Sequence, residues 1–202
     1  MDGLGAQVSD LSLAHRYDGS AVAVVPPVDE AQWIEAARRG DLEAFDAIMA
    51  RYESAILRFL ISVVYDVEIA RELCQDTFLA AYEALPRSQG EMRLSSWLFT
   101  IALNRARSHH RRQRLRRFVP LEDHHHPISR RDVGEALAVH ELVQRVLERM
   151  PQQYVRPLLL QTVGGLTCRE IAEVLGTTEG AVKVRLLRAR EAFRQAYGEE
   201  TA

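Results

Sequence analysis

Apolar residues recur every three or four positions along almost the whole chain from Ala31 onward, and no segment shows the two-residue alternation of a half-buried strand. The first long repeat includes Leu42, Phe45 and Ile48 and runs to Val63. It begins after a Gly-Asp pair, which is typical of one helix end followed by the N-cap of the next helix. The chain is therefore predicted to be all-α.

The helical pattern falls into two parts. Residues 118–134 contain two prolines, a glycine and three consecutive histidines, a composition that predicts a linker. Residues 1–29 contain Gly, Ser, Asp and Pro without helical period, and they are predicted to form a disordered tail. The sequence thus predicts two small helical domains, residues 30–117 and 135–197, joined by a flexible linker, with a short tail at 198–202.

Composition argues against several classes of protein. The two cysteines, Cys74 and Cys168, do not form a CxxC pair, so neither a disulfide scaffold nor a zinc ribbon is expected. Adjacent histidines, as at 124–126, cannot alone hold a metal in fixed tetrahedral geometry. The longest apolar run, Ala21–Val25, is far below the roughly 20 residues that cross a bilayer, and the N-terminus does not resemble a secretory signal. We expect a cytoplasmic protein without metal or cofactor.

The net charge of −2 conceals a strong asymmetry. Residues 31–104 carry eleven acidic and seven basic side chains, whereas Arg105–Arg117 contains seven arginines and no acid. Such a cationic block in an otherwise acidic chain is typical of a nucleic-acid contact. A solvated helix end explains the charge equally well.

A helix predicted to start at Asp66 has two opposed faces. At about 100° per residue, its apolar positions from Val67 to Leu85 fall on one side, which we expect to be core. The opposite side is acidic with one exposed leucine, and it is either plain surface or a docking face. The residues on this side are Glu68, Glu72, Gln75, Asp76, Leu79 and Glu83.

The segment Pro86–Arg93 is predicted to be a loop, and Ser95 to cap the helix that continues into the arginine block. Phe99, Ala102 and Leu103 belong to its core side. Bases stack on aromatic rings and polar groups read them, so the opposite side suits an unpaired strand. Its candidate residues are Trp97, Thr100, Asn104, Arg107 and Arg111. The alternative is a tryptophan half-buried against the preceding loop.

Residues 166–195 show the strongest local pattern. Thr167 and Glu170 have the spacing of a capping box, Gly176 suits the left-handed residue that ends a helix, and Thr177-Thr178 begin a second helix. This arrangement predicts a helix–turn–helix, whose second helix enters the major groove. The core side of that helix includes Val182 and Leu186. Its candidate duplex-reading residues are Lys183, Val184, Arg185, Leu187 and Arg188. An ordinary helical hairpin is the alternative.

Four stretches, in this order, resemble the extracytoplasmic-function (ECF) sigma factors of bacterial RNA polymerase. The resemblance covers residues 31–117 and 135–197, and its matching stretches are 37–52, 70–85, 95–114 and 147–190.

The resemblance implies a factor that binds core RNA polymerase at its clamp and flap, captures the melted −10 element and reads the −35 element as duplex. It assigns the Asp66 helix to the clamp, with Glu72, Gln75, Asp76 and Leu79 as candidate contacts. It assigns the Pro86–Arg93 loop and the Trp97 face to the −10 strand, and the Lys183 face to the −35 element. It also implies an anti-sigma factor as a further partner.

One departure from the family pattern and two alternative functions bear on this assignment. The loop residues Ser88–Met92 depart from the aromatic and arginine that the family usually carries there. A stand-alone helix–turn–helix regulator is the first alternative, although residues 31–117 resemble no sensing or dimerisation module. The second is a metal-dependent enzyme built around the histidines, for which paired carboxylates, a nucleophile motif and a phosphate loop are all lacking. We therefore expect a protein that is not an enzyme.

Overall fold

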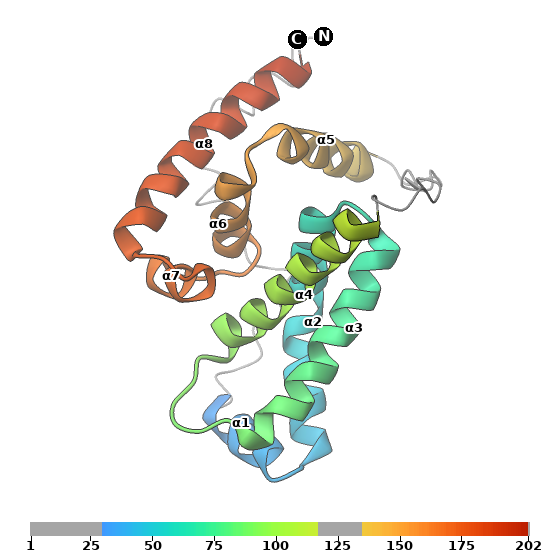
Figure 1. Ribbon diagram of the computed structural model, residues 1–202, viewed down its shortest axis with the longest axis vertical. Helices are drawn as coiled ribbons and strands as arrows, with labels where there is room; N and C mark the ends of the chain where they lie inside the picture. The colour runs from blue at the N-terminus through green and yellow to red at the C-terminus, as the bar shows by residue number, and fades with distance from the viewer. Residues whose placement is uncertain (1–29, 117–134, 202) are drawn as a thin grey trace.

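The computed structural model describes residues 30–116 and 135–201, and the side chains of 30–114 and 142–201. Within these ranges every regular element is helical, so the predicted all-α fold is confirmed (Figure 1). The predicted tail at 1–29 and the predicted linker at 118–134, with His124–His126, lie outside the described residues.

Aspartate side chains cap the first turns of two of the N-terminal helices. They are α1 (Glu30–Arg38), α2 (Leu42–Val64), α3 (Val67–Ala84), the short 3-10 helix η2 (Leu85–Arg87) and α4 (Leu94–Arg116). The Asp41 carboxylate accepts hydrogen bonds from the amides of Glu43 (3.0 Å) and Ala44 (3.2 Å), and Asp66 accepts one from the Ile69 amide (3.0 Å).

The predicted cap at Ser95 is wrong. Helix α4 begins one residue earlier, at Leu94, and the Arg93 carbonyl accepts the Trp97 amide at 3.1 Å. Ser95 therefore lies inside the first turn. The position of the cap depends on how the preceding loop enters the helix, and serine at a single position does not determine that.

Helices α2, α3 and α4 lie side by side, with α1 across one end of the bundle (Figure 1). Their inner faces are the predicted apolar stripes: Phe59 of α2 meets Phe99 of α4 edge-to-face with ring centroids 5.3 Å apart. Ala70, Cys74 and Phe78 of α3 are buried beside them, as predicted. Leu42 differs from the prediction, because 61% of its surface is exposed.

The C-terminal part contains α5 (Glu135–Arg149), α6 (Gln152–Thr162), α7 (Cys168–Leu175) and α8 (Glu179–Thr201). The predicted capping box is confirmed. The Thr167 hydroxyl accepts a hydrogen bond from the Glu170 amide, and the Glu170 carboxylate accepts one from the Thr167 amide at 2.8 Å. Gly176 ends α7 with φ of 64°, in the left-handed region as predicted. Helices α7 and α8 form the predicted helix–turn–helix.

Helix α8 continues to Thr201, past residue 197, where the sequence pattern ended the domain. Its last turn is held to α5 by Glu200, whose carboxylate lies 2.7 Å from the Arg145 guanidinium and 2.6 Å from that of Arg149. These ion pairs with α5 thus stabilise the last turn of α8, which lies beyond the apolar repeat.

The two sets of helices pack against each other, and their buried side chains form one continuous core. Helix α4 contacts α7, and α2 contacts α6. Gln144 donates to the Ser62 hydroxyl at 3.3 Å in a buried position, and the Arg93 guanidinium lies 2.9 Å from the Glu170 carboxylate. The sequence pattern gave no indication of this contact.

A substitution at Gly164, which lies just after α6, tests the packing between the two sets of helices. A methyl group at this position would lie 2.7 Å from both the Leu160 carbonyl oxygen and Leu166 Cδ1, and 3.0 Å from Phe99 Cζ across the interface. We expect Gly164→Ala to lower the free energy of unfolding in urea by about 1–3 kcal/mol, because the added carbon overpacks the contact. The control is Gly198→Ala, where a methyl group meets nothing within 4 Å. A Gly164→Ala protein as stable as wild type would contradict this packing.

Candidate nucleic-acid interface

The exposed side of α8 carries the residues that the sequence predicted to read duplex DNA. Val184 is 50% exposed and Leu187 is 59% exposed, although both are aliphatic. Lys183 and Arg188 are exposed beside them, and Arg185 is half-buried on the flank. The opposite side of the helix is buried in the core at Val182, Leu186 and Ala189. Apolar groups between cations therefore face outward from a helix whose other side is fixed.

The Lys183 ammonium lies 2.7 Å from the Glu179 carboxylate, one turn earlier in α8. This hydrogen bond and ion pair raise the pKa of Lys183 above its ordinary value, so the side chain stays charged. Because both groups are exposed to solvent, this ion pair is weak, and Lys183 can bind a phosphate in place of Glu179.

A shallow hollow adjoins this face between α8 and the start of α6. Gln153 and Tyr154 of α6 line it opposite Gly180, Val184 and Arg188 of α8. Sequence analysis missed Gln153 and Tyr154, because they belong to another helix and only the tertiary fold brings them beside the recognition helix. The hollow extends the candidate duplex-binding surface beyond the five predicted residues.

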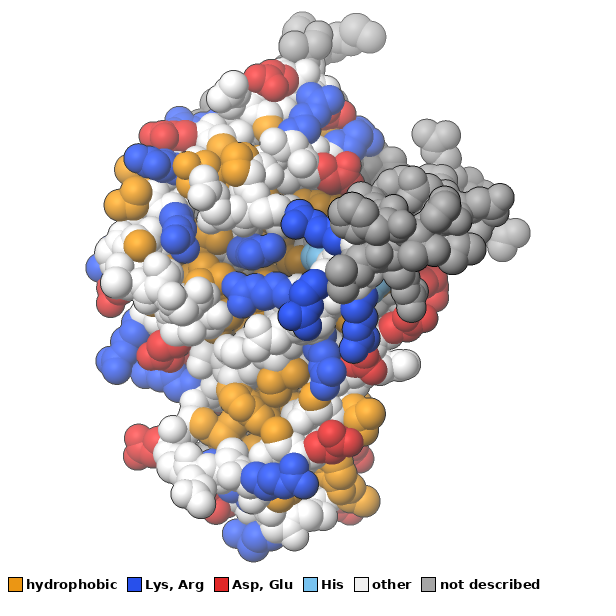
Figure 2. Space-filling model, viewed as in Figure 1, with side chains coloured by type: hydrophobic (Ala, Val, Ile, Leu, Met, Phe, Trp, Pro, Cys, Tyr) orange, Lys and Arg blue, Asp and Glu red, His pale blue; other side chains and the backbone are white. Residues whose placement is uncertain are grey.

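Helix α4 carries the residues predicted to bind an unpaired strand. Asn104, Arg107 and Arg111 are exposed, while Thr100 is half-buried and donates to the Ser96 carbonyl at 2.8 Å. Trp97 is half-buried and packs against the core, so only part of its ring is available for stacking. Figure 2 shows Lys and Arg side chains gathered across the middle of this face, and in the same view of Figure 1 helix α4 lies below α5 and α6.

Part of the positive charge near α4 comes from the other domain. Burial lowers the pKa of Arg156 on α6, and the nearby Arg107 of α4 lowers it further. Sequence analysis missed Arg156, because no other cation lies near it in the sequence and only the fold brings it beside the arginines of α4.

A histidine on this part of α4 is partly buried. Burial lowers the pKa of His110, and this effect exceeds the opposite effect of its hydrogen bond to the Val63 backbone.

The four residues predicted as a docking face on α3, namely Glu72, Gln75, Asp76 and Leu79, are all exposed. Gln75 and Leu79 also line an open groove between α2 and α3, whereas Glu72 and Asp76 do not. Apolar side chains of both helices make up most of this groove: Leu42, Phe45, Met49, Leu57, Phe78, Leu79 and Tyr82. Leu79 is 59% exposed, so the fold leaves an apolar surface uncovered.

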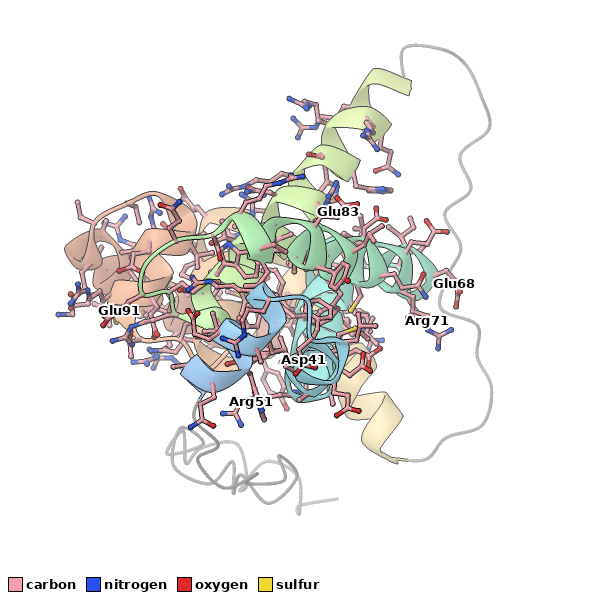
Figure 3. All side chains as sticks on the ribbon, turned by 90° about the horizontal axis from the view of Figure 1, so that it is seen from below. Asp41, Arg51, Glu68, Arg71, Glu83 and Glu91 are labelled. Carbon is pink, nitrogen blue, oxygen red and sulfur yellow. The ribbon has the colours of Figure 1, made fainter. Side chains whose placement is uncertain are left out.

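The floor of the groove is well packed. Phe45 and Tyr82 meet edge-to-face with ring centroids 5.1 Å apart. Cys74 is buried and also lines the groove, and burial together with the nearby Glu53 raises the pKa of its thiol to about 11, which keeps it protonated. Arg71 at the rim is held by Glu68 at 2.9 Å, and the two lie next to each other in Figure 3.

Among residues 30–114 and 142–201, no cluster of three metal-ligating side chains occurs. The helices in the part of the chain that the structure describes include none long and apolar enough to cross a membrane.

Two family models match the chain. Sigma-70 region 2 matches residues 48–116, which include α3 and α4, and sigma-70 region 4 matches residues 140–193, which include the helix–turn–helix. Together these matches cover well over half of the chain. The chain belongs to the sigma-70 family. It is therefore a transcription initiation factor and not an enzyme, as the sequence predicted.

Curated relatives agree with the ECF class, and a solved structure shares the fold. The chain is 29% identical to the RNA polymerase sigma-H factor of Pseudomonas aeruginosa, over 82% of this chain and 92% of that protein. It is 26% identical to the ECF RNA polymerase sigma-E factor of Escherichia coli, over 79% and 90%. The structure of CnrH in complex with the cytosolic domain of CnrY matches with a TM-score of 0.63 and 25% identity, over 82% of this chain and 95% of CnrH. The predicted membership of the ECF sigma factors is confirmed.

Proposed function

We propose that this sigma factor binds core RNA polymerase and directs initiation by reading the −35 element as duplex and the −10 element as a melted strand. The observation that carries the proposal is the exposed face of α8, where Val184 and Leu187 stand between Lys183 and Arg188. In a major groove, cations reach guanine edges and phosphates, and aliphatic groups contact thymine methyls. A face exposed only to water gains nothing from the two aliphatic side chains.

The α4 face supports the −10 part of the proposal. Trp97 offers the exposed part of its ring for stacking, Asn104 offers an amide for a base edge, and Arg107 and Arg111 offer charge for phosphates. The residue types match a single strand better than a duplex, because a stacked base pair hides the face of each base.

The α2–α3 groove supports polymerase binding. An uncovered apolar surface with an acidic border at Glu72 and Asp76 is suited to an amphipathic partner of opposite charge. We assign this groove to the polymerase clamp and the C-terminal helices to the flap. The sigma factor RpoE of Bartonella quintana, which has a similar fold, was solved in complex with the anti-sigma factor NepR, so we also propose that an anti-sigma factor binds this protein. These partners would place it in the cytoplasm.

The proposal requires the two domains to separate. Elements centred near −35 and −10 are about 25 base pairs apart, or about 85 Å at 3.4 Å per base pair. While α4 touches α7, the faces of α4 and α8 cannot be that far apart, since each helix has 23 residues and is about 35 Å long. The contact across Gln144 and Ser62 must therefore open on promoter binding.

A run-off transcription assay tests the proposal. Purified core polymerase on genomic promoter fragments is expected to give new, discrete start sites only when this chain is added. A stand-alone helix–turn–helix regulator would instead bind duplex DNA by itself and leave the start sites of core polymerase unchanged. No new start site on any fragment would overturn the proposal.

Trp97→Ala and Asn104→Ala are expected to slow strand opening by about tenfold or more while leaving closed-complex formation near the wild-type rate, because base stacking contributes about 1–3 kcal/mol per base. A fluorescent base analogue in the −10 element measures opening, and the association of fluorescent duplex measures the earlier step. Gln32→Ala, an exposed amide on α1, serves as the control. Equal losses in both steps would show that Trp97 acts only through packing.

A further inference from the structure

The loop between η2 and α4 is tied down by a single side chain from α1. The Arg38 guanidinium donates through Nε to the Ser88 hydroxyl at 3.1 Å and through Nη2 to the Gly90 carbonyl at 2.9 Å. The same Nη2 lies 3.6 Å from Met92 Sδ, and Nη1 pairs with Glu35 on its own helix. Arg38 thus contacts the loop at three positions, 50 to 54 residues away in the chain.

The chemistry of these contacts requires arginine. The Arg38 side chain is only 15% exposed, and its planar group directs donors at a hydroxyl and a carbonyl at the same time. A lysine ammonium at this depth has a single nitrogen and cannot span both acceptors in the same geometry. Gly90 adopts φ of 75°, a backbone turn that L side chains rarely adopt, and Arg38 binds the carbonyl of that residue.

The loop leads directly into the α4 face described above. Its first residues are fixed to η2, since the Ser88 hydroxyl donates to the Leu85 carbonyl at 2.6 Å. Its last residue, Arg93, precedes α4 and lies four positions before Trp97. The loop therefore ends one helical turn before Trp97, at the start of the helix that carries the proposed strand-binding face.

A side chain of the other domain also holds the end of the loop. Within the described residues, the Arg93 guanidinium pairs with Glu170, whose carboxylate also completes the capping box of α7. Burial opposes ionisation of Glu170, but hydrogen bonds from Thr167 and Arg93 outweigh it and lower its pKa. This tether breaks when the domains separate, whereas Arg38 stays with the loop.

We propose that Arg38 is a positioning residue for promoter recognition: it holds the loop 88–92 in the shape that contacts the unpaired −10 strand. The inference rests on the proposed function, because it assumes that the loop and α4 bind that strand. Arg38 does not touch DNA in this scheme. It acts through Ser88, Gly90 and Met92, and its effect falls on discrimination between bases, since displacing a binding group by about 1 Å can cost about 100-fold.

The test compares Arg38→Ala and Arg38→Lys with a matched control, Arg39→Ala. Arg39 carries the same charge on the same turn, is exposed, and makes no side-chain contact with the described residues that would fix the loop. Each variant is assembled with core polymerase, and the rate of open-complex formation is measured on a promoter and on derivatives with one −10 base changed. Polymerase affinity, binding of −35 duplex and hydrogen exchange of the loop amides are measured in parallel.

We expect Arg38→Ala to reduce the rate ratio between the preferred and the substituted promoters by about tenfold, to speed exchange in the loop, and to leave polymerase affinity and −35 binding unchanged. Arg38→Lys is expected to fall between Arg38→Ala and wild type, and Arg39→Ala to match wild type. Because Arg38→Lys keeps the charge, it carries the test if the alanine variant does not fold.

Unchanged rate ratios in Arg38→Ala, or an equal slowing on every promoter, would overturn the positioning role even if the loop exchanges faster. Failure of the wild-type protein to open any promoter with core polymerase is a different result. It would overturn the proposed function, and with it the role of the loop.

Discussion

Alanine at both Lys183 and Arg188 is expected to reduce initiation at −35-dependent promoters by about 100-fold or more, because each good contact with a base edge contributes about 1–3 kcal/mol. Both side chains are exposed on the outer face of α8, and neither supports the core on the opposite side of the helix. The free energy of unfolding should therefore change little. Abortive and run-off transcription with preassembled holoenzyme, at concentrations below those that saturate the promoter, measures the loss.

The same double variant should weaken the salt dependence of −35 duplex binding, by about one unit of slope for each phosphate contact removed. Arg194→Ala is the control, because Arg194 is an exposed cation two turns further along α8 and lies outside the hollow shared with α6. A double variant that loses polymerase affinity instead of promoter affinity would show that this face of α8 docks on the flap.

The second large effect is expected at the α2–α3 groove. Gln75→Ala combined with Leu79→Ala should weaken core polymerase binding by about 30-fold, because a buried contact at the centre of an interface contributes about 2 kcal/mol or more. Leu79 is 59% exposed in the free protein, so its truncation leaves no internal cavity. Competition with a labelled sigma factor for core polymerase measures the change.

Glu72→Ala combined with Asp76→Ala distinguishes the groove from its acidic border. These two residues share the predicted face of α3 but do not line the groove. We expect this double variant to lower mainly the rate at which the protein associates with core polymerase at low salt. Charges at the rim of an interface affect the association rate more than the dissociation rate. Equal losses in both double variants would mean that charge, and not the apolar groove, binds polymerase. Unchanged affinity in both would make this face of α3 ordinary surface.

Arrangements that depend on neighbours in the sequence were predicted correctly. The capping box of Thr167 and Glu170 and the left-handed Gly176 each involve residues within one helical turn, where hydrogen bonds form the same way in almost any fold. The buried stripes of α3 and α8 followed from the helical period, since that period fixes which side chains share a face.

The incorrect predictions concern what lies next to a helix. Leu42 continues the apolar repeat of α2, yet no described element covers it, and it becomes part of the groove rim. Ser95 has the residue type of an N-cap, but the incoming loop places the start of α4 one residue earlier. Period and residue type specify a face, and only the packing of other elements decides whether that face is covered.

From its sequence alone, this chain was assigned an all-α architecture and a helix–turn–helix, because these follow from short-range spacing along the chain. Its membership of a family of transcription initiation factors was inferred from four stretches that resemble that family in the same order. Tertiary structure alone decided that Arg38 reaches the loop at 88–92, that α2 and α3 frame an apolar groove, and that Glu170 holds Arg93 from the other domain. Those contacts join residues tens of positions apart, and no local periodicity encodes which distant side chains meet when helices pack.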